Sequence, residues 1–252
     1  MSKNVTTKSN TTVSPIMDDI LNSAGEGVDY DTSELQIPFV RVIQALSPQI
    51  KKSDPQFIEG ASQGDLFNTV TGEFWAGDGG IEVIPCYQET KYLEFIPRDQ
   101  GGGFVGEIEV DSPLLSQTTR DRSVEILPSG NQLVKSDQHF CMVLNKDGSA
   151  QPAIIDMKSS ALKVSRRWKT QIAMFKIQDK EGEFKQPALF ATKWRIKTVE
   201  ESNELGTWYN LNVEKIDLVD SKALFQEAKN FRSSVMKGEA KAVTENQEDT
   251  PF

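Results

Sequence analysis

The chain has 252 residues, of which 37% are hydrophobic, and a formal net charge of -9. That length suffices for one sizeable core, and no apolar run approaches the roughly 18 residues of a membrane-spanning helix. The chain has only two cysteines and one histidine, too few ligands for the usual metal clusters and few of the side chains that hydrolase triads need. The sequence therefore predicts a cytoplasmic protein that is not an enzyme, with no catalytic residue, no metal, no cofactor and no membrane partner.

The negative charge is concentrated at the two ends of the chain. Residues 1–36 hold two basic and six acidic side chains (net -4), and residues 239–252 hold one and four (net -3). The body between them has 25 basic and 27 acidic side chains, so it is nearly neutral. Within the body, residues 156–197 contain eleven basic and four acidic side chains, a net charge of +7. A basic segment between acidic ends is compatible with binding to a polyanion.

The N-terminal segment is strongly polar. Nine of the first 14 residues are Ser, Thr or Asn, and such a segment buries too little apolar surface to offset the entropy of ordering. We therefore expect a disordered arm over residues 1–36, with a short helix near residues 16–21. Folded structure is expected to begin at residues 37–47, where apolar and β-branched side chains recur at strand spacing.

Strands dominate the next part of the chain. Glycines punctuate residues 60–75, which predicts a loop, a short strand, a turn and another strand. Residues 81–97 are long enough for one bent strand or a strand pair, and residues 104–110 are predicted to form another strand after a glycine-rich turn. The apolar runs at residues 139–144 and 153–157 predict two further strands, joined by a turn rich in Asn, Asp and Gly.

The hydrophobic period changes to that of a helix at residues 159–176. Two strands follow, at residues 188–199 and 206–219, with a hairpin-like connection between them. A last helix over residues 221–237 is ended by Gly238. The side chains that fall on the inner face of the first helix are Ala161, Val164, Ser165, Trp168, Ile172 and Phe175.

This order of elements predicts a mainly β fold with helices. We expect an OB-fold-like barrel with an inserted helix, a C-terminal helix and disordered termini. The expected parts are an N-terminal arm (residues 1–36), a barrel domain (residues 37–238) and an acidic tail (residues 239–252). A different small barrel or an α+β sandwich would give a similar string of elements.

Binding of a single strand of nucleic acid requires cations for the phosphates and aromatic rings on which bases stack. The alternation in ALFATKWRIKTV puts Lys193, Arg195 and Lys197 on one face, and Trp194 on the other, toward the core. On the next strand, Trp208 falls on the polar side and is the predicted stacking residue. These residues are the first candidate DNA-binding group.

Two further groups are candidates for DNA binding. Lys91, Tyr92 and Arg98 lie near the RDQGGG turn, whose glycines would let a loop fold over a DNA strand, although a plain flexible hairpin fits equally well. The basic side of the predicted first helix is the third group, and a solvated helix face fits it equally well. The residues of this third group are Lys163, Arg166 and Arg167.

The C-terminal sequence ENQEDTPF places acidic side chains before a proline and a terminal aromatic residue, a composition typical of short partner-binding motifs. Glu248, Asp249, Pro251 and Phe252 resemble the acidic, aromatic-ended tip of bacterial and phage single-stranded DNA-binding proteins. The segments IPFVRVIQALSPQ, GDLFNTVTGEFW and DQGGGFVGE are similar to phage-encoded proteins of this class. The chain differs from the bacterial version in its longer body and its less densely acidic tail.

This resemblance implies an OB-fold that binds single-stranded DNA without sequence preference, in phage replication, recombination and repair. A phage-encoded protein of this kind would act in the host cell cytoplasm, and homodimers are compatible with the class. The tail would contact replication proteins such as a DNA polymerase or a helicase-primase, unless it is simply solvated and has no partner. Two other functions stay open: a protein-interaction or virion-associated module, and a metal-dependent DNA enzyme.

Overall fold

The computed structural model describes residues 15–23, 26–27, 36–122, 124–204 and 206–240. The chain divides into two compact units, residues 1–35 and residues 36–252. The first unit contains helix α1 (Pro15–Asn22), which confirms the short helix predicted from the sequence. Most of the predicted arm, and the tail from residue 241, lie outside the described residues.

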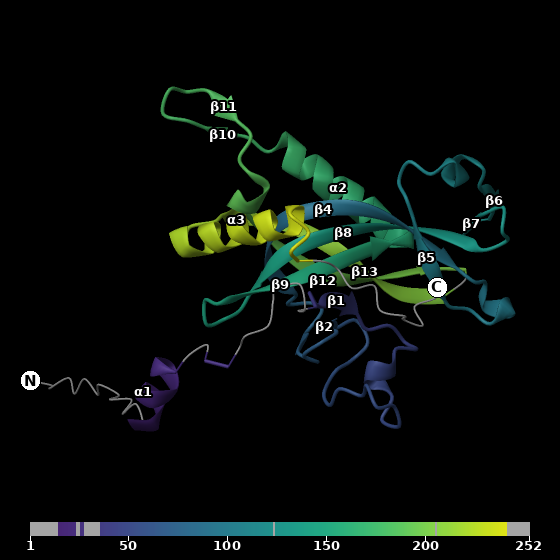
Figure 1. The fold of residues 1–252 in the computed structure, drawn as a ribbon, viewed down its shortest axis with the longest axis horizontal. Helices are drawn as coiled ribbons and strands as arrows, with labels where there is room; N and C mark the ends of the chain where they lie inside the picture. The colour runs from purple at the N-terminus through teal and green to yellow at the C-terminus, as the bar shows by residue number, and fades with distance from the viewer. Residues whose placement is uncertain (1–14, 24–25, 28–35, 123, 205, 241–252) are drawn as a thin grey trace, which may run out of the picture. The chain divides into compact units, whose positions relative to one another are not determined.

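The second unit is built mainly from strands (Figure 1). Its two longer helices are α2 (Leu162–Met174) and α3 (Lys222–Met236). The strands of the described residues are β1 (Phe39–Val42), β2 (Leu66–Asn68), β3 (Phe74–Trp75), β4 (Ile81–Phe95), β5 (Phe104–Ile108), β6 (Thr119–Asp121), β7 (Val124–Ile126), β8 (Gln132–Leu144), β9 (Ala150–Lys158), β10 (Ile177–Gln178), β11 (Phe184–Lys185), β12 (Thr192–Asn203) and β13 (Gly206–Leu218). Single-turn 3-10 helices lie at Pro48–Ile50, Arg98–Gln100, Pro113–Ser116, Ser159–Ala161 and Leu189–Ala191.

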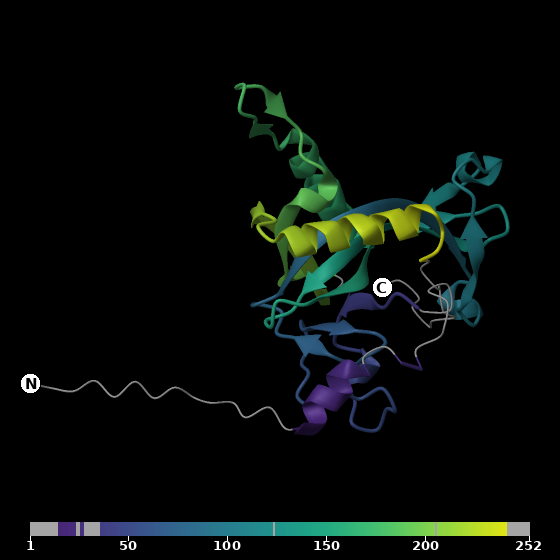
Figure 2. The same cartoon turned by 60° about the vertical axis from the view of Figure 1, so that its left-hand side comes forward.

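One sheet of eleven strands organises the second unit, with the main order β13-β12-β4-β8-β9-β1-β2-β3. Strand β5 pairs with β4, β7 pairs with β8, and β6 pairs with β7, so the far halves of β4 and β8 form an arm that extends beyond the main sheet. The pair β1–β9 is parallel, and the other pairs of this sheet are antiparallel. Strands β10 and β11 form a separate hairpin that projects from the body (Figure 2).

The main sheet curls so strongly that the chain just after β1 meets the edge of β13. There the side chain of Gln44 takes the place of a neighbouring strand: its Nε2 donates to the carbonyl of Tyr209 (2.7 Å), and its Oε1 accepts from the Tyr209 N–H (2.9 Å). The concave side encloses the largest apolar core, against which α2 packs with Trp168, while Trp194 comes from β12. Both indoles are fully buried and meet edge to face, with ring centroids 5.9 Å apart.

Helix α3 covers the opposite side of the sheet (Figures 1 and 2). Its N-cap is Ser221, whose hydroxyl accepts from the Leu224 N–H (3.3 Å) and so satisfies one of the unpaired donors of the first turn. The helix buries Ala228 and packs Phe231 against two smaller apolar clusters on this side of the sheet. The helix predicted over residues 221–237 is therefore confirmed.

The structure confirms the predicted fold class: a mainly β protein with a strongly curled sheet, consistent with an OB-like barrel, an inserted helix and a C-terminal helix. Of the two alternatives for residues 81–97, the structure shows one strand, β4, with a bulge between Pro85 and Tyr87. Other details differ from the expectations. Strand β8 begins seven residues before the predicted residue 139, and the hairpin β10–β11 was not predicted. No helix in the described part of the chain is long and apolar enough to span a membrane.

Candidate nucleic-acid interface

The pair β12–β13 carries the first candidate group. The alternation of these strands buries Trp194 and Ile196 in the core and leaves the cations on the outer face. Lys197 is opposite Asn212, and Glu201 is opposite Trp208, so Trp208 lies on the same outer face as the cations. The register therefore agrees with the predicted arrangement. We call the outer surface formed by Lys193, Arg195, Lys197 and Trp208 the strand face.

Each cation of the strand face has a carboxylate partner from another part of the chain. Lys193 pairs with Asp220 (3.2 Å), Arg195 with Glu82 (2.5 Å) and Lys197 with Glu214 (3.7 Å). The alternation along one strand does not predict these pairs, because their carboxylates come from other elements. They reduce the positive charge of the strand face.

Helix α2 joins the strand face at its β13 edge. The guanidinium of Arg167 donates to the side-chain oxygen of Asn212 (2.7 Å), and the ammonium of Lys163 pairs with Glu201 (2.9 Å). Desolvation would raise the pKa of Glu201, but hydrogen bonds from Lys163 and Asn210 outweigh it and lower this pKa. Two cations of the third candidate group thus adjoin the strand face.

The solvent side of α2 carries a continuous row of cations. Its inner side buries Val164, Ser165 and Trp168, as predicted from the helical period. At about 100° per residue, Arg167 lies on the flank toward β13, Lys163 and Arg166 lie at the top, and Lys169 lies on the opposite flank. The row therefore crosses the whole outer surface of the helix.

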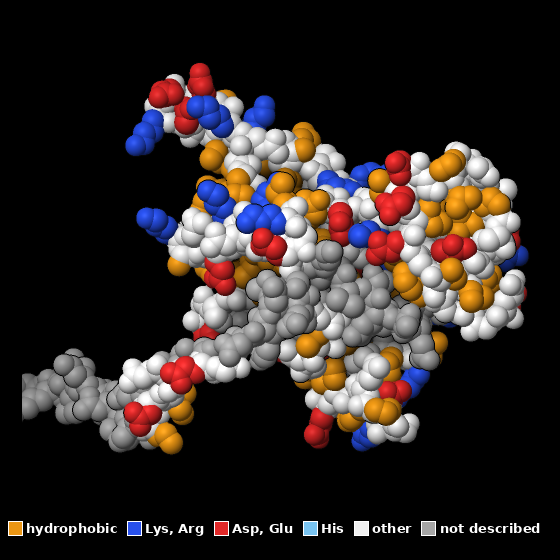
Figure 3. Space-filling model, viewed as in Figure 1, with side chains coloured by type: hydrophobic (Ala, Val, Ile, Leu, Met, Phe, Trp, Pro, Cys, Tyr) orange, Lys and Arg blue, Asp and Glu red, His pale blue; other side chains and the backbone are white. Residues whose placement is uncertain are grey.

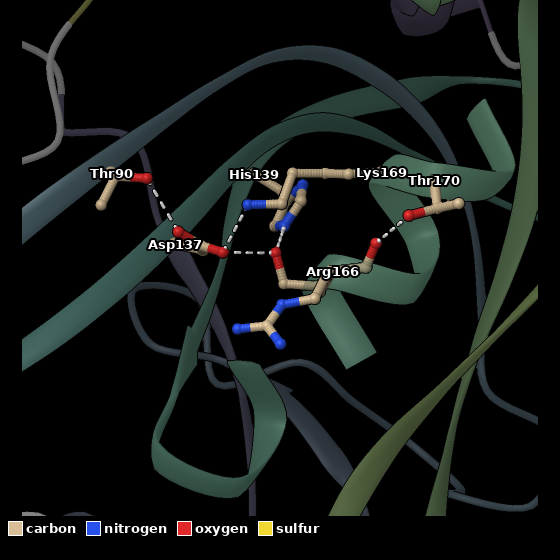
Figure 4. Close-up of polar contacts among 7 residues, drawn as sticks. Thr90, Asp137, His139, Arg166, Lys169 and Thr170 are labelled. Carbon is tan, nitrogen blue, oxygen red and sulfur yellow. Dashed lines mark hydrogen bonds and ion pairs between the residues drawn. The ribbon is translucent and has the colours of Figure 1, made fainter. Parts of the chain in front are cut away.

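A buried polar network fixes the Lys169 flank of α2 to β8 (Figure 4). Asp137, only 2% exposed, accepts from the Ser165 hydroxyl (2.7 Å) and pairs with the Lys169 ammonium (2.6 Å) through Oδ2, and accepts from the Thr90 hydroxyl (2.8 Å) through Oδ1. Desolvation would raise the pKa of Asp137, but these hydrogen bonds and the charge of Lys169 lower it. The carboxylate is therefore ionised at neutral pH.

His139 completes this network, but in an order unlike that of a hydrolase triad. The hydroxyl of Ser165 gives its single proton to Asp137, so Nε2 of His139, 2.9 Å from the Ser165 oxygen, must be the donor in that contact. The serine thus sits between the histidine and the aspartate, whereas a triad places the histidine in the middle. Burial lowers the pKa of His139 to about 3, and its ring stacks on Trp168 with centroids 4.5 Å apart. This geometry makes the network an anchor for α2.

The second candidate group does not form one surface. Lys91 and Tyr92 are consecutive residues of β4, so their side chains point to opposite faces of the sheet. Lys91 pairs with Glu107 (2.9 Å) and Glu89 (3.7 Å), and these two acids raise its pKa although desolvation alone would lower it. Arg98 is exposed in the short 3-10 helix beyond the end of β4. The expectation that these three residues act together is therefore not supported by their positions.

Two cations that were not predicted as site residues, Lys135 and Lys169, lie near Tyr92. Lys135 is directly opposite Tyr92 in the β4–β8 pair, and Lys169 reaches the same face of the sheet through Asp137. Lys135 was overlooked because the first half of β8 is too polar to read as a strand. Lys169 was detectable, because it lies one helical turn after Arg166.

The predicted partner-binding residues of the tail, Glu248, Asp249, Pro251 and Phe252, lie outside the described residues.

A group of carboxylates spaced for a metal ion occurs in the part of the chain that the structure describes. It consists of Asp179, Glu181 and Glu183, at the exposed tip of the β10–β11 hairpin. Asp179 already pairs there with Lys185, so this group is explained as part of the hairpin. On the face of the molecule in Figure 3, basic and acidic side chains are interspersed.

Comparison with known proteins relates the chain to a phage protein family. A family model described as Pam3 phage gp34-like protein matches residues 7–241, a range that includes every strand and helix described above. No curated protein matches the chain. No solved structure matches it either.

Proposed function

The chain belongs to the Pam3 phage gp34-like family and is a phage protein, and we propose that it binds single-stranded DNA without catalysing a reaction on it. The observation that carries this proposal is the strand face, on which three cations and Trp208 share one side of β12–β13. The cations of α2 extend this surface, and the OB-like barrel is an architecture that binds oligonucleotides in other proteins. Replication, recombination and repair of phage DNA are the processes that need such a protein.

The ion pairs of the strand face are compatible with DNA binding. The side chains of Arg195 and Glu82 are 40% and 39% exposed, and those of Lys197 and Glu214 are 31% and 50% exposed. Such exposed pairs contribute only about 0–1 kcal/mol each. A DNA phosphate can therefore replace the carboxylate partner at small cost, and until then the pair holds the cation on the surface.

The test is a fluorescence anisotropy titration with a dye-labelled oligo(dT), using the double variant Arg195→Ala/Lys197→Ala. We expect the affinity to fall by at least about tenfold at low salt, because two phosphate contacts are lost. The slope of log affinity against log salt should also become shallower by about 1.4, since each phosphate contact on a single strand contributes about 0.7.

The matched control is Lys51→Ala/Lys52→Ala, which removes two exposed cations from a loop. It should bind the oligonucleotide with nearly the affinity of the unmodified protein. Equal losses in both double variants would show that only the overall charge matters, and would contradict binding at the strand face.

The acidic tail gives the proposal its second part. We propose that Glu248, Asp249, Pro251 and Phe252 recruit replication proteins, such as a DNA polymerase or a helicase-primase. The carboxylates of the tail would also compete with DNA for the cations of the body when DNA is absent, because both carry negative charge.

A second candidate function, binding of another protein through the body, is favoured by one specific feature. The β10–β11 hairpin projects from the body and leaves Phe184 68% exposed, while Met174, at the end of α2, is 75% exposed. Exposed apolar side chains of this size often mark interaction sites. If a Phe184→Ser variant still binds DNA, the hairpin surface is not part of the DNA site. Protein binding through the hairpin would then be a function separate from DNA binding.

A further inference from the structure

The arm formed by the far halves of β4 and β8 carries a second surface suited to nucleic acid. Tyr92 of β4 and Lys135 of β8 are directly opposite each other, on the face that also carries the pair Thr90 and Asp137 two residues away. Two residues along a strand correspond to about 7 Å. Tyr92 and Lys135 therefore lie beside the point where the Asp137 network attaches α2 to the sheet. We call the surface formed by Tyr92, Lys135, Arg166 and Lys169 the arm surface.

Positive charge exceeds negative charge on the arm surface. Lys135 and Arg166 are exposed, and neither has a carboxylate partner among the residues that the structure describes. Lys169 does pair with a carboxylate, but that carboxylate is Asp137, which is buried and also serves Ser165 and Thr90. On the strand face, in contrast, each strand cation has its own carboxylate.

The limits of the arm surface are set by acidic residues. Glu94 is the next residue on the Tyr92 side of β4, and Glu125 of β7 is opposite Leu133 on the same face. The carboxylate of Glu94 is held by the side chains of Asn131 (2.6 Å) and Ser129 (3.0 Å). The positive region thus ends before the tip of the arm, and it opens toward α2.

Helix α2 connects the arm surface to the strand face. Arg167 contacts Asn212 on β13 at one flank of the helix, and Lys169 contacts Asp137 on β8 at the other. Arg166 lies between them, and its guanidinium extends from the helix on the side on which Asp137 lies (Figure 4). Cations therefore follow one another from β12, across α2, to the arm. Trp208, opposite Glu201, lies near Lys163 of α2, and Tyr92 lies on the arm.

We propose that a single strand of DNA bound at the strand face continues across α2 to the arm surface. A base stacks on Tyr92 there, and Lys135, Arg166 and Lys169 bind the adjacent phosphates. Asp137 is a positioning residue, because it holds Lys169 against the sheet without touching the ligand. This inference rests on the proposed function and adds to it a second contact region, which only a sufficiently long strand reaches.

The dependence of affinity on oligonucleotide length tests the proposal. In the unmodified full chain, affinity for oligo(dT) should keep rising with length over the range of about 4–20 nucleotides, because longer strands reach both surfaces. In Tyr92→Ala/Lys135→Ala the affinity should stop rising at a shorter length. The loss should be at least about tenfold for the longest strand and less than about twofold for the shortest, since only the longest strand loses a stacked base and a phosphate contact. The control variant Lys146→Ala, which removes an exposed cation from the β8–β9 turn, should follow the unmodified curve.

Each outcome of this experiment has a distinct meaning. A double variant whose curve coincides with that of the unmodified protein, or is lowered by the same factor at every length, overturns the arm surface and leaves the proposed function standing. An unmodified protein that binds no oligonucleotide of any length overturns the proposed function itself.

A measurement on the unmodified protein avoids any effect of substitution on folding. Oligonucleotides carrying one 5-iodouracil at successive positions cross-link to aromatic side chains on which that base stacks. Cross-links to Trp208 and Tyr92 from positions several nucleotides apart support the proposed path. Cross-links confined to Trp208 at every position overturn it.

Discussion

At the scale of single residues, the interior of the protein combines two buried indoles, Trp168 and Trp194, with a buried polar network around Asp137. Trp168 and Trp194 were assignable to the core, because each falls on the apolar side of a helical or strand period, and both are fully buried. The contacts of Asp137 with Ser165 and Lys169 were not, because they join residues about 30 positions apart. Periodicity shows which side of an element faces inward, but not which polar groups meet there.

His139 makes the stability of the fold dependent on pH. Its pKa is lowered to about 3 by burial, whereas an unfolded histidine titrates near 6.5. Below about pH 6.5 the unfolded chain takes up a proton that the folded chain does not. The free energy of unfolding should therefore fall by about 1.4 kcal/mol per pH unit from pH 6.5 toward pH 3. Asp137 adds to this fall at the acidic end: its pKa is lowered, so its contribution is lost as pH drops below the unfolded value near 4.

Urea denaturation at several pH values measures this dependence. The variant His139→Gln keeps an N–H donor for Ser165 but does not titrate. It should lack most of the slope between pH 6.5 and 4 that the unmodified protein shows. Parallel curves for the two proteins would mean that the buried imidazole is not the group responsible.

At the scale of elements, strands with an apolar alternation were predicted and polar ones were not. The pair β12–β13 was expected over residues 188–199 and 206–219, because Trp194 and Ile196 alternate with cations, but β12 begins at Thr192 and continues to Asn203. The first half of β8 reads QLVKSD, and its buried Ser136 and Asp137 break the alternation. The hairpin β10–β11 has only two residues in each strand, too few to form a period.

Closure of the curled sheet depends on a close approach that only glycine permits. A Cβ added at Gly77 would lie 2.1 Å from both the Gly64 carbonyl oxygen and the Thr198 hydroxyl oxygen. Thr198 donates to that same carbonyl (2.6 Å), and its N–H donates to the Gly77 carbonyl (2.9 Å), so these atoms have little freedom to move. Gly77→Ala should therefore destabilise the fold by about 1–3 kcal/mol, as overpacking does.

Gly106 in β5 provides the matched control for this substitution. It has no neighbour within 4 Å of an added Cβ, and it does not have a positive φ. Gly106→Ala should change the free energy of unfolding, measured by urea denaturation, by less than about 1 kcal/mol. If Gly77→Ala and Gly106→Ala lower the free energy of unfolding by similar amounts, closure of the sheet does not depend on the close approach at Gly77.

At the scale of the whole molecule, the sequence predicts where charge is concentrated, but not how it is compensated. Residues 156–197 do form the basic region, with a net charge of +7. Three of its cations are paired with Glu82, Glu214 and Asp220, which all lie outside that segment. Folding thus neutralises the part of the surface that alternation marked most clearly, and leaves cations without partners, among the described residues, on α2 and the arm.

Removal of the tail tests the proposed competition between tail and DNA. Ala240 packs against the buried cluster of Ile37, Phe39, Phe140 and Ile154, so a truncation that ends at Ala240 keeps this contact of the body. The truncated protein should bind oligo(dT) more tightly at low salt, because its acidic competitor is gone, and should no longer capture a phage polymerase or helicase-primase. Unchanged affinity at low salt would rule out the competition, and retained capture would rule out recruitment through the tail.

The most direct test of the account is the titration of the unmodified protein with oligo(dT) at increasing salt. We predict measurable binding at low ionic strength, with log affinity falling linearly with log salt, because cations of the strand face contact phosphates. The loss of this binding in Arg195→Ala/Lys197→Ala, but not in Lys51→Ala/Lys52→Ala, would locate it. Absence of binding at low ionic strength, or an affinity that does not change with salt, would contradict the account.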